Sequence, residues 1–294
     1  VAPHFPFVVP KEFYDLYPLE NLPSRKLDPL TGFQRHPWLQ RMNDFQGHDD
    51  TLTPEQRLQC VAAYFGLCTF MDHQVGQVLE ALHETGLDKN TRIIYTSDHG
   101  DNLGARGMWG KSNMYEESAG IPLIISGEGI PKNKICRTTT SLLDSYQTVL
   151  HGVGISLKKE EKNLDGKSWF TLANQGDDSE RTVFSEYHAS ASPSGAFMIR
   201  KGRYKYIHYV GYDPELFDLE TDPEETTDLA GDPSYSKTLA EYRQYLFDIC
   251  DPEFTDRQAK NDQNVLVKTF GGREKALHIG TPGATPAPGK GHQS

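Results

Sequence analysis

One stretch, residues 91–126, limits what this chain can fold into more than any other part of the sequence. It begins with an apolar, β-branched run over residues 92–97, which is typical of a buried strand. That run ends abruptly in Asp98-His99-Gly100, a glycine-rich loop follows, and a second apolar run spans residues 121–125. Because open α/β sheets place ligands at the carboxyl ends of their strands, we expect a functional site beginning at Asp98.

Asp98 and His99 are candidate metal ligands. A carboxylate beside an imidazole suits a divalent ion, and the pair fits Mn²⁺ or Zn²⁺ better than it fits the all-oxygen preference of Ca²⁺ or Mg²⁺. Such ions need roughly four to eight ligands, so the others must come from elsewhere in the fold. The structural alternative is a capped turn, in which both side chains only bind the local backbone.

Lys111 and Trp109 lie in the glycine-rich loop that follows. Glycines let the backbone approach a ligand closely, and a lysine there can neutralise an oxyanion or protonate a leaving oxygen. Trp109 is a candidate wall of a substrate pocket, or it only packs, and Lys111 read alone is equally typical of a surface lysine. The glycine spacing matches neither a Walker loop nor a dinucleotide fingerprint, so we exclude nucleotide binding.

The segment before this stretch predicts a long helix. Thr53-Pro54-Glu55-Gln56 forms a capping box with proline at the first helical position, and Gly86 marks the far end. A second helix is expected over residues 141–151, with its apolar face covering a sheet. Helix, strand, loop and strand with short connections predict an α/β fold. The apolar stripe of the long helix comprises Leu58, Val61, Phe65, Cys68, Met71, Val75, Val78, Leu79 and Leu82.

The pattern changes in the second half of the chain. A charged linker over residues 158–166 precedes a run of short strands, at 182–187, 196–200, 203–209 and 215–219, and a helix at 236–249. Lys201-Gly202 predicts a tight hairpin between two of the strands. We therefore expect an α/β catalytic part over residues 1–157, an α+β subdomain over 158–270, and an irregular or disordered tail over 271–294. The proline-rich residues 1–52 are also expected to be irregular.

Composition limits the classes of partner that this protein can bind and the cellular compartments in which it is expected. The formal charge of −11 leaves no basic footprint for nucleic acid, and no apolar run approaches the ~18 residues of a membrane span. The acidic residues between 213 and 232 are expected to form a solvated surface. Four cysteines without CxxC spacing favour a reduced, cytoplasmic compartment. A periplasmic or secreted location stays open, because a signal sequence could precede Val1.

Taken together, the motifs resemble the sulfatase family of the alkaline-phosphatase-like superfamily. They occur in the family's order, as PHFPF at residues 3–7, SDHG at 97–100, GK at 110–111, YEE at 115–117 and ELFDL at 215–219. The resemblance implies a mostly parallel sheet flanked by helices, followed by a small subdomain with an antiparallel sheet. It further implies hydrolysis of a small-molecule sulfate ester and leaves a homo-oligomer open.

The resemblance also assigns roles to individual residues. Asp98 and His99 would bind one divalent metal ion, with Ca²⁺ or Mn²⁺ expected. Lys111 would contact the sulfate and the leaving-group oxygen, and His4 would be the second residue that contacts sulfate and donates a proton. Trp109 is not assigned by the resemblance and stays a candidate substrate-binding residue from its place in the loop.

The sequence also departs from the family pattern. Family members attack with a formylglycine made from Cys or Ser in C/S-x-P-S/A-R, upstream of the PHxP segment, and this chain contains no such motif. The upstream acidic metal ligands are also absent. We therefore expect the distal part of a sulfatase that is inactive by itself. The alternatives are a phosphonate monoester or phosphodiester hydrolase of the same superfamily, and an inactive fragment or non-enzymatic module.

Overall fold

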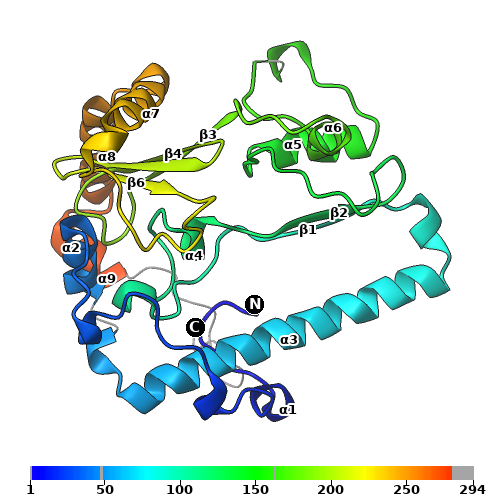
Figure 1. Ribbon diagram of the computed structural model, residues 1–294, viewed down its shortest axis with the longest axis horizontal. Helices are drawn as coiled ribbons and strands as arrows, with labels where there is room; N and C mark the ends of the chain where they lie inside the picture. The colour runs from blue at the N-terminus through cyan, green and yellow to red at the C-terminus, as the bar shows by residue number, and fades with distance from the viewer. Residues whose placement is uncertain (1, 47–48, 162, 280–294) are drawn as a thin grey trace.

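A computed structural model describes residues 2–46, 49–161 and 163–279. The helix α3 (Pro54–Glu84) runs along the lower side of the molecule in Figure 1, from below α2 towards the turn that leads into the β1–β2 ribbon. The sheet β3–β6 gathers with helices α7 and α8 at one end, and α5 and α6 lie at the other (Figure 1). None of the helices in the described ranges is both long enough and apolar enough to cross a membrane.

The long helix begins and ends as the sequence predicts. The Thr53 hydroxyl accepts the Gln56 amide at 3.2 Å, and the Gln56 side chain accepts the Thr53 amide at 2.8 Å. Gly86 follows the helix with a left-handed φ of +71°. Near the middle of α3, Gly66 admits the short helix α1 (Lys11–Tyr14), because a Cβ there would lie 2.9 Å from the carbonyl oxygen of Phe13.

The strands of the 91–126 stretch pair in the opposite sense to the prediction. β1 (Ile93–Thr96) and β2 (Leu123–Ser126) are antiparallel, with Ile93 opposite Ser126, and every strand pair in the described residues is antiparallel. The expected mostly parallel sheet is therefore not seen. A parallel pair needs a crossover that carries the chain back to its starting edge. The connection between β1 and β2 is instead a loop whose main helix is the one-turn α4 (Glu116–Ala119).

The apolar faces predicted for the first half are only partly buried. In the stripe of α3, Val78 is 68% exposed, while most of the other residues are half-buried. β1 was expected to be a buried strand, and this expectation is wrong because its Tyr95 is 42% exposed; Ile124 of β2 is 62% exposed. The buried apolar residues of α3 lie near its N-terminal end instead, at Ala62, Ala63 and Leu67. In the described chain no sheet covers these faces, because the β1–β2 ribbon has only two strands.

Helix α5 (Asp144–Gly152) also differs from its predicted role. Leu143 and Val149, expected to cover a sheet, are exposed. The helix packs instead against α6 (Trp169–Asn174), where the Trp169 amide donates to the Thr148 hydroxyl at 2.8 Å. The predicted domain boundary at 157/158 thus separates α5 from α6, although these two helices pack on each other. The domain division stays a prediction.

The second half follows the sequence closely. β3 (Thr182–Tyr187), β4 (Ala196–Lys201), β5 (Tyr204–Tyr209) and β6 (Glu215–Asp218) form an antiparallel sheet in chain order. Gly202 closes the predicted hairpin with a φ of +50°. The alternation of strand residues gives the sheet two buried faces. One packs on α7 (Ser236–Ile249) through Ile199, Tyr206, Leu216, Tyr242 and Leu246, and the other packs on α2 and the 108–115 loop through Met198, Ile207, Phe217, Trp38 and Tyr115.

The sequence did not predict six of the helices in the described chain, namely the short α1, α4 and α6 and the three that follow here. α2 (Pro37–Gln46) lies in the segment predicted to be irregular and buries Trp38, Leu39 and Met42 completely. α8 (Pro252–Thr269) begins at an Asp251 cap. Residues 271–294 were predicted to be irregular or disordered, and this is wrong for the first part, which contains α9 (Arg273–Ile279). Residues 280–294 lie outside the described chain. Short 3₁₀ turns occur at Leu19–Asn21, Pro29–Thr31, Asp49–Thr51, Leu87–Asn90, Ala105–Gly107, Lys159–Glu161 and Pro233–Tyr235.

Candidate functional site

The structure brings the predicted site residues together from three segments of the chain. Asp98 and His99 directly follow β1, Lys111 lies on the loop beyond them, and His4 comes from the N-terminal segment. The Nε2 atom of His4 lies 2.6 Å from the Nζ atom of Lys111. The ring centroids of His4 and His99 are 6.1 Å apart. Residues more than a hundred positions apart thus share one site.

Asp98 and His99 are held in a conformation suited to a cation. The Nδ1 atom of His99 lies 2.9 Å from the carbonyl oxygen of Gly100. When Nδ1 donates there, the lone pair of Nε2 is free to bind a ligand, and Nε2 lies 3.4 Å from the Oδ2 atom of Asp98. The Asp98 side chain is 82% exposed, so its carboxylate can reach an ion in the adjacent space.

A carboxylate oxygen and an imidazole nitrogen that face each other fit a divalent ion as two of its ligands. Burial disfavours the charged form of Asp98, but protonated His99 and local hydrogen bonds outweigh this effect and lower the pKa of Asp98. The hydrogen bond from the His99 amide remains when the ring is neutral. The carboxylate is thus ready to bind a cation. Within the described residues no group of three His, Cys, Asp or Glu side chains gathers around one point. Two ligands are fewer than a divalent ion needs, so the pair does not complete a metal site by itself.

His4 and Lys111 form a donor pair beside these ligands. The Nδ1 atom of His4 lies 2.7 Å from the Phe5 carbonyl oxygen, so with its proton on Nδ1 the ring accepts a hydrogen bond from Lys111 at Nε2. The ammonium of Lys111 also lies 5.3 Å from the centroid of the Phe5 ring. Both side chains present nitrogen atoms where an anionic group could approach.

Two cavities meet at Lys111. One of about 500 Å³ is lined by Asp98, His99 and Lys111, and by Glu186 and Tyr187 at the end of β3. The other, of about 310 Å³, is lined by Lys111, Trp109, Phe5 and Phe7 among others. Lys111 can therefore contact a group in either cavity.

Trp109 both packs and lines a cavity, so neither of its two predicted roles is excluded. Its indole N–H donates to Asp49 at 2.8 Å, and Asp49 also binds Arg57 at 3.0 Å and Arg25 at 3.1 Å. Burial opposes ionisation of Asp49, but these donors outweigh it and lower its pKa. The indole ring is thereby fixed beside Gly104, where a Cβ would lie 3.3 Å from the ring.

Two polar residues of the loop, Asp101 and Asn102, fix the backbone next to Lys111. The Asn102 amide group donates to the carbonyl oxygen of Gly110 at 2.7 Å, and Asp101 accepts the Gly110 amide at 3.2 Å. Burial raises the pKa of Asp101. Sequence reasoning missed both residues, although their position directly after Asp98-His99-Gly100 could have indicated them.

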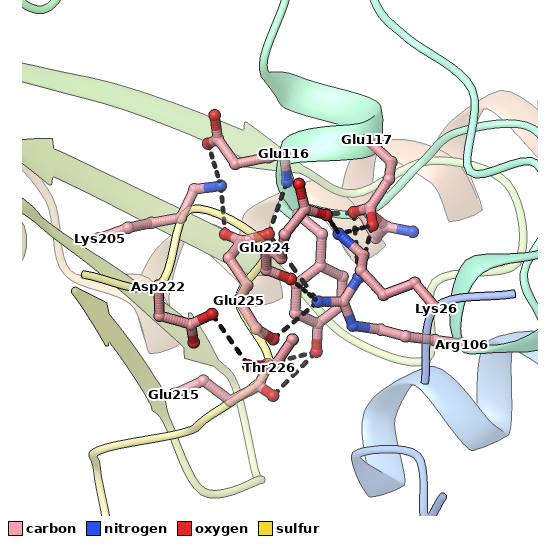
Figure 2. A network of polar contacts seen from close by, with 12 residues as sticks. Lys26, Arg106, Glu116, Glu117, Lys205, Glu215, Asp222, Glu224, Glu225 and Thr226 are labelled. Atoms are coloured by element: carbon pink, nitrogen blue, oxygen red, sulfur yellow. Dashed lines mark hydrogen bonds and ion pairs between the residues drawn. The ribbon is translucent and has the colours of Figure 1, made fainter. Parts of the chain in front are cut away.

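A buried polar network joins this loop to the C-terminal sheet. Figure 2 shows Lys205 of β5 between Glu116 and Glu225, and Arg106 next to Glu117. The Glu215 carboxylate accepts hydrogen bonds from two tyrosine hydroxyls, from Tyr115 at 2.7 Å and from Tyr209 at 2.9 Å.

The expectation that the acidic residues between 213 and 232 form a solvated surface is correct only in part. Glu215, Asp218 and Glu225 are buried. Five other acidic residues of this stretch are exposed, at 213, 220, 224, 228 and 232. The sequence signal that could have revealed the buried charges is a charged residue within an otherwise apolar strand, as in Glu215-Leu216-Phe217 and Tyr204-Lys205-Tyr206.

Two family profiles match the chain. The profile described as Sulfatase covers residues 1–155. The profile described as N-sulphoglucosamine sulphohydrolase, C-terminal, covers residues 104–251. The two matches overlap in the loop that carries Lys111 and in the segments that follow it.

The chain is similar to known proteins over most of its length. Choline-sulfatase of Rhizobium meliloti (strain 1021) is 37% identical over 270 residues, which are 89% of this chain and 51% of that protein. A phosphonate monoester hydrolase from Silicibacter pomeroyi has a TM-score of 0.72 at 26% identity, over 84% of this chain and 54% of that one. A 2-O GAG sulfatase has a TM-score of 0.61 at 29% identity, over 87% and 53%.

The chain spans about half the length of the choline-sulfatase that it matches. The Sulfatase profile nevertheless covers more than half of this chain and includes His4, Asp98, His99 and Lys111. The chain belongs to the sulfatase family.

Proposed function

We propose that the protein containing this chain is a metal-dependent hydrolase of sulfate monoesters. The observation that carries this proposal is the convergence of His4 and Lys111 beside the Asp98–His99 pair, with 2.6 Å between Nε2 of His4 and Nζ of Lys111. A cation-binding pair next to two nitrogen donors suits an anionic ester. The similarity to a choline-sulfatase favours sulfate as the anion.

Each residue has a role that follows from its contacts. Lys111 neutralises charge on the sulfate oxygens and on the leaving oxygen, because its ammonium faces the cavity. His4 accepts a hydrogen bond from Lys111 at Nε2, and once Nε2 takes up a proton the ring can donate it to an ester oxygen that replaces this contact. Asp98 and His99 hold the metal ion, which supplies Lewis-acid stabilisation when bound. Trp109 and Phe5 border the space for the alcohol.

The nucleophile in this proposal is a formylglycine in the C/S-x-P-S/A-R context, encoded upstream of Val1. The exposed apolar residues of α3 and β2, such as Val78 and Ile124, support the proposal that a further part of the fold covers them. The chain by itself is therefore expected to be inactive. The coding sequence upstream of Val1 tests this point, and the lack of a Cys or Ser in that motif would favour a non-enzymatic module.

A phosphonate monoester hydrolase is the second candidate, since a solved enzyme of that description shares the fold at a TM-score of 0.72. Steady-state rates of the full-length protein on an aryl sulfate and on an aryl phosphonate monoester separate the two. We expect kcat/KM to be higher for the sulfate. An equal or higher value for the phosphonate would replace our proposal with the second candidate.

A further inference from the structure

The one-turn helix α4 lies between the candidate site and the C-terminal sheet. Three consecutive residues at its start each bind the network in Figure 2. The Tyr115 hydroxyl donates to Glu215 at 2.7 Å, and the Glu116 amide donates to the Glu225 carboxylate at 2.7 Å. The Glu117 carboxylate accepts Arg106 at 3.0 Å. The turn is thus attached to the sheet through side chains on one side.

On its other side the same turn supports the segment of the metal ligands. The Gly100 amide donates to the carbonyl oxygen of Ser118 at 2.9 Å. A Cβ at Gly100 would lie 2.0 Å from the Glu117 carbonyl oxygen, so the two backbones are in direct contact. Gly100 directly follows His99, and a shift of the turn therefore moves the Asp98–His99 pair.

The turn is also linked to the backbone of Lys111. Asn113 donates to the side chain of Asn102 at 3.0 Å, and Asn102 donates to the Gly110 carbonyl oxygen at 2.7 Å. Asn113 is buried and its side chain also accepts the Tyr115 amide at 3.2 Å. The same turn is therefore linked by hydrogen bonds to the backbone next to Lys111 and to the backbone next to the Asp98–His99 pair.

Glu225 is the residue through which the sheet holds this turn. Its side chain is fully buried and accepts both the Lys205 ammonium and the Glu116 amide at 2.7 Å. Its backbone carbonyl accepts Arg106 at 2.9 Å. Glu225 and Arg106 both have left-handed backbone conformations, with φ of +52° and +54°. Residues other than glycine adopt this conformation at a cost, which persists where the surrounding contacts enforce it.

We propose that Glu225 is a positioning residue, which sets the separation of Lys111 from the Asp98–His99 pair by holding the Glu116 amide from the C-terminal sheet. The expected effect of Glu225 on catalysis rests on the proposed function. Its effect on how firmly residues 98–111 are held in place does not depend on that function. A buried ion pair is a weak source of stability compared with apolar residues of similar size, so a role in placement explains why the pair is present.

Two matched double variants of the full-length protein test the proposal. Both remove the buried ion pair by Lys205→Met. The first adds Glu225→Gln, whose side-chain oxygen can still accept the Glu116 amide, and the second adds Glu225→Leu, which cannot. A control, Arg203→Met with Asp218→Asn, removes an ion pair of the same sheet that does not contact the turn.

The first measurement is amide hydrogen exchange of peptides from residues 98–111 and from β4. We expect the Leu variant to exchange at least about tenfold faster in the 98–111 peptide, with β4 unchanged, because local order depends on the contacts that remain. The Gln variant and the Arg203–Asp218 control should match the wild type. Equal protection in the Gln and Leu variants would overturn the proposal, whether or not the protein hydrolyses sulfate esters.

The second experiment measures two quantities for each variant: the steady-state rate of aryl sulfate hydrolysis and the melting temperature. The Leu variant should lose about 10²-fold in kcat with little change in KM, since misplacement of about 1 Å can have this effect. The Gln variant should stay within a few-fold of the wild type. A decrease in kcat that follows the melting temperature across all three variants would show a structural role only. If the wild-type protein has no activity, the proposed function fails, while the exchange result still decides the positioning role.

Discussion

Two regions of this molecule reverse the usual distribution of side chains. At the junction of the 98–120 loop with the C-terminal sheet, charged residues are buried, and Lys205 is 1% exposed. Across α3, β2 and α5, apolar residues face outwards, and Val78 is 68% exposed. Both patterns are unusual, since lysine is almost never fully buried without a partner and large apolar patches mark interaction sites.

The difference shows which part of the fold is complete within this chain. Each buried charge at the junction finds its partners within the described residues, as Lys205 does with Glu116 and Glu225. Their hydrogen bonds offset the desolvation of the charges only while all the partners are present. The outward apolar residues have no such partners in the described chain, and burial against another surface would stabilise them by about 25 cal/mol per Å².

Removal of Arg106 should have the largest effect, because it breaks the junction. Arg106 is 2% exposed, binds Glu117 and stacks on the Tyr115 ring at 3.8 Å. Arg106→Ala leaves a cavity beside the Tyr115 ring and leaves the buried Glu225 carbonyl oxygen without its donor, although Lys26 still pairs with Glu117, and should lower the free energy of unfolding by about 3–5 kcal/mol. Chemical denaturation measures this value. A loss below about 1 kcal/mol would contradict the complete burial of the junction.

The pH dependence of stability tests the same junction through Glu215. Burial raises the pKa of Glu215 to about 7, from an ordinary value near 4.5, although two tyrosine hydroxyls donate to it. The folded state therefore binds this proton more tightly than the unfolded state, and the contribution is complete below pH 4.5. The free energy of unfolding should fall by about 3 kcal/mol as the pH rises from about 4.5 to 7.

Glu215→Gln removes the titrating group and keeps a partner for Tyr115 and Tyr209. Denaturation curves between pH 4.5 and 8 should show a weaker pH dependence for this variant than for the wild type. We expect the variant to be at least as stable as the wild type above pH 7, where burial of the charge is unfavourable. An unchanged pH dependence would mean that Glu215 titrates near its ordinary pKa.

Lys111 lies on the open side of the same loop, five residues beyond Arg106. Its contacts are His4 and Phe5, outside the buried network. Lys111→Ala in the full-length protein should lower kcat by about 10²-fold or more, with little change in melting temperature. Lys89→Ala, at a turn after α3, provides a control. Wild-type turnover of the Lys111 variant would contradict its assigned role.

The smallest effect is expected on the exposed apolar face. Val78→Ser and Ile124→Thr in the isolated chain should change the free energy of unfolding by less than about 0.5 kcal/mol, because both side chains face solvent there. In the full-length protein the same changes should destabilise by about 1–3 kcal/mol, if a further part of the fold buries them. Denaturation of both forms measures the difference. Equal small effects in both forms would mean that the face stays exposed.

Local chemistry made much of the fold predictable. The Thr53–Gln56 capping box, the Gly202 hairpin and the four strands of the C-terminal sheet depend on residues close together in sequence, and the structure contains them all. The order of motifs also indicated His4, Asp98, His99 and Lys111, which the structure brings into one site. The roles of these residues in catalysis and metal binding stay predictions.

The sequence by itself determined the long helix α3, the Gly202 hairpin, the strands of the C-terminal sheet, and the residues that follow β1 at the site. Only the tertiary structure decided that β1 and β2 are antiparallel, that Val78 faces outwards, and that Glu225 is buried with Lys205. The physical reason is that periodicity and caps act within a few residues, whereas strand sense and burial depend on partners far along the chain. An acidic stretch therefore looks like surface in the sequence until the cation that neutralises it is placed beside it.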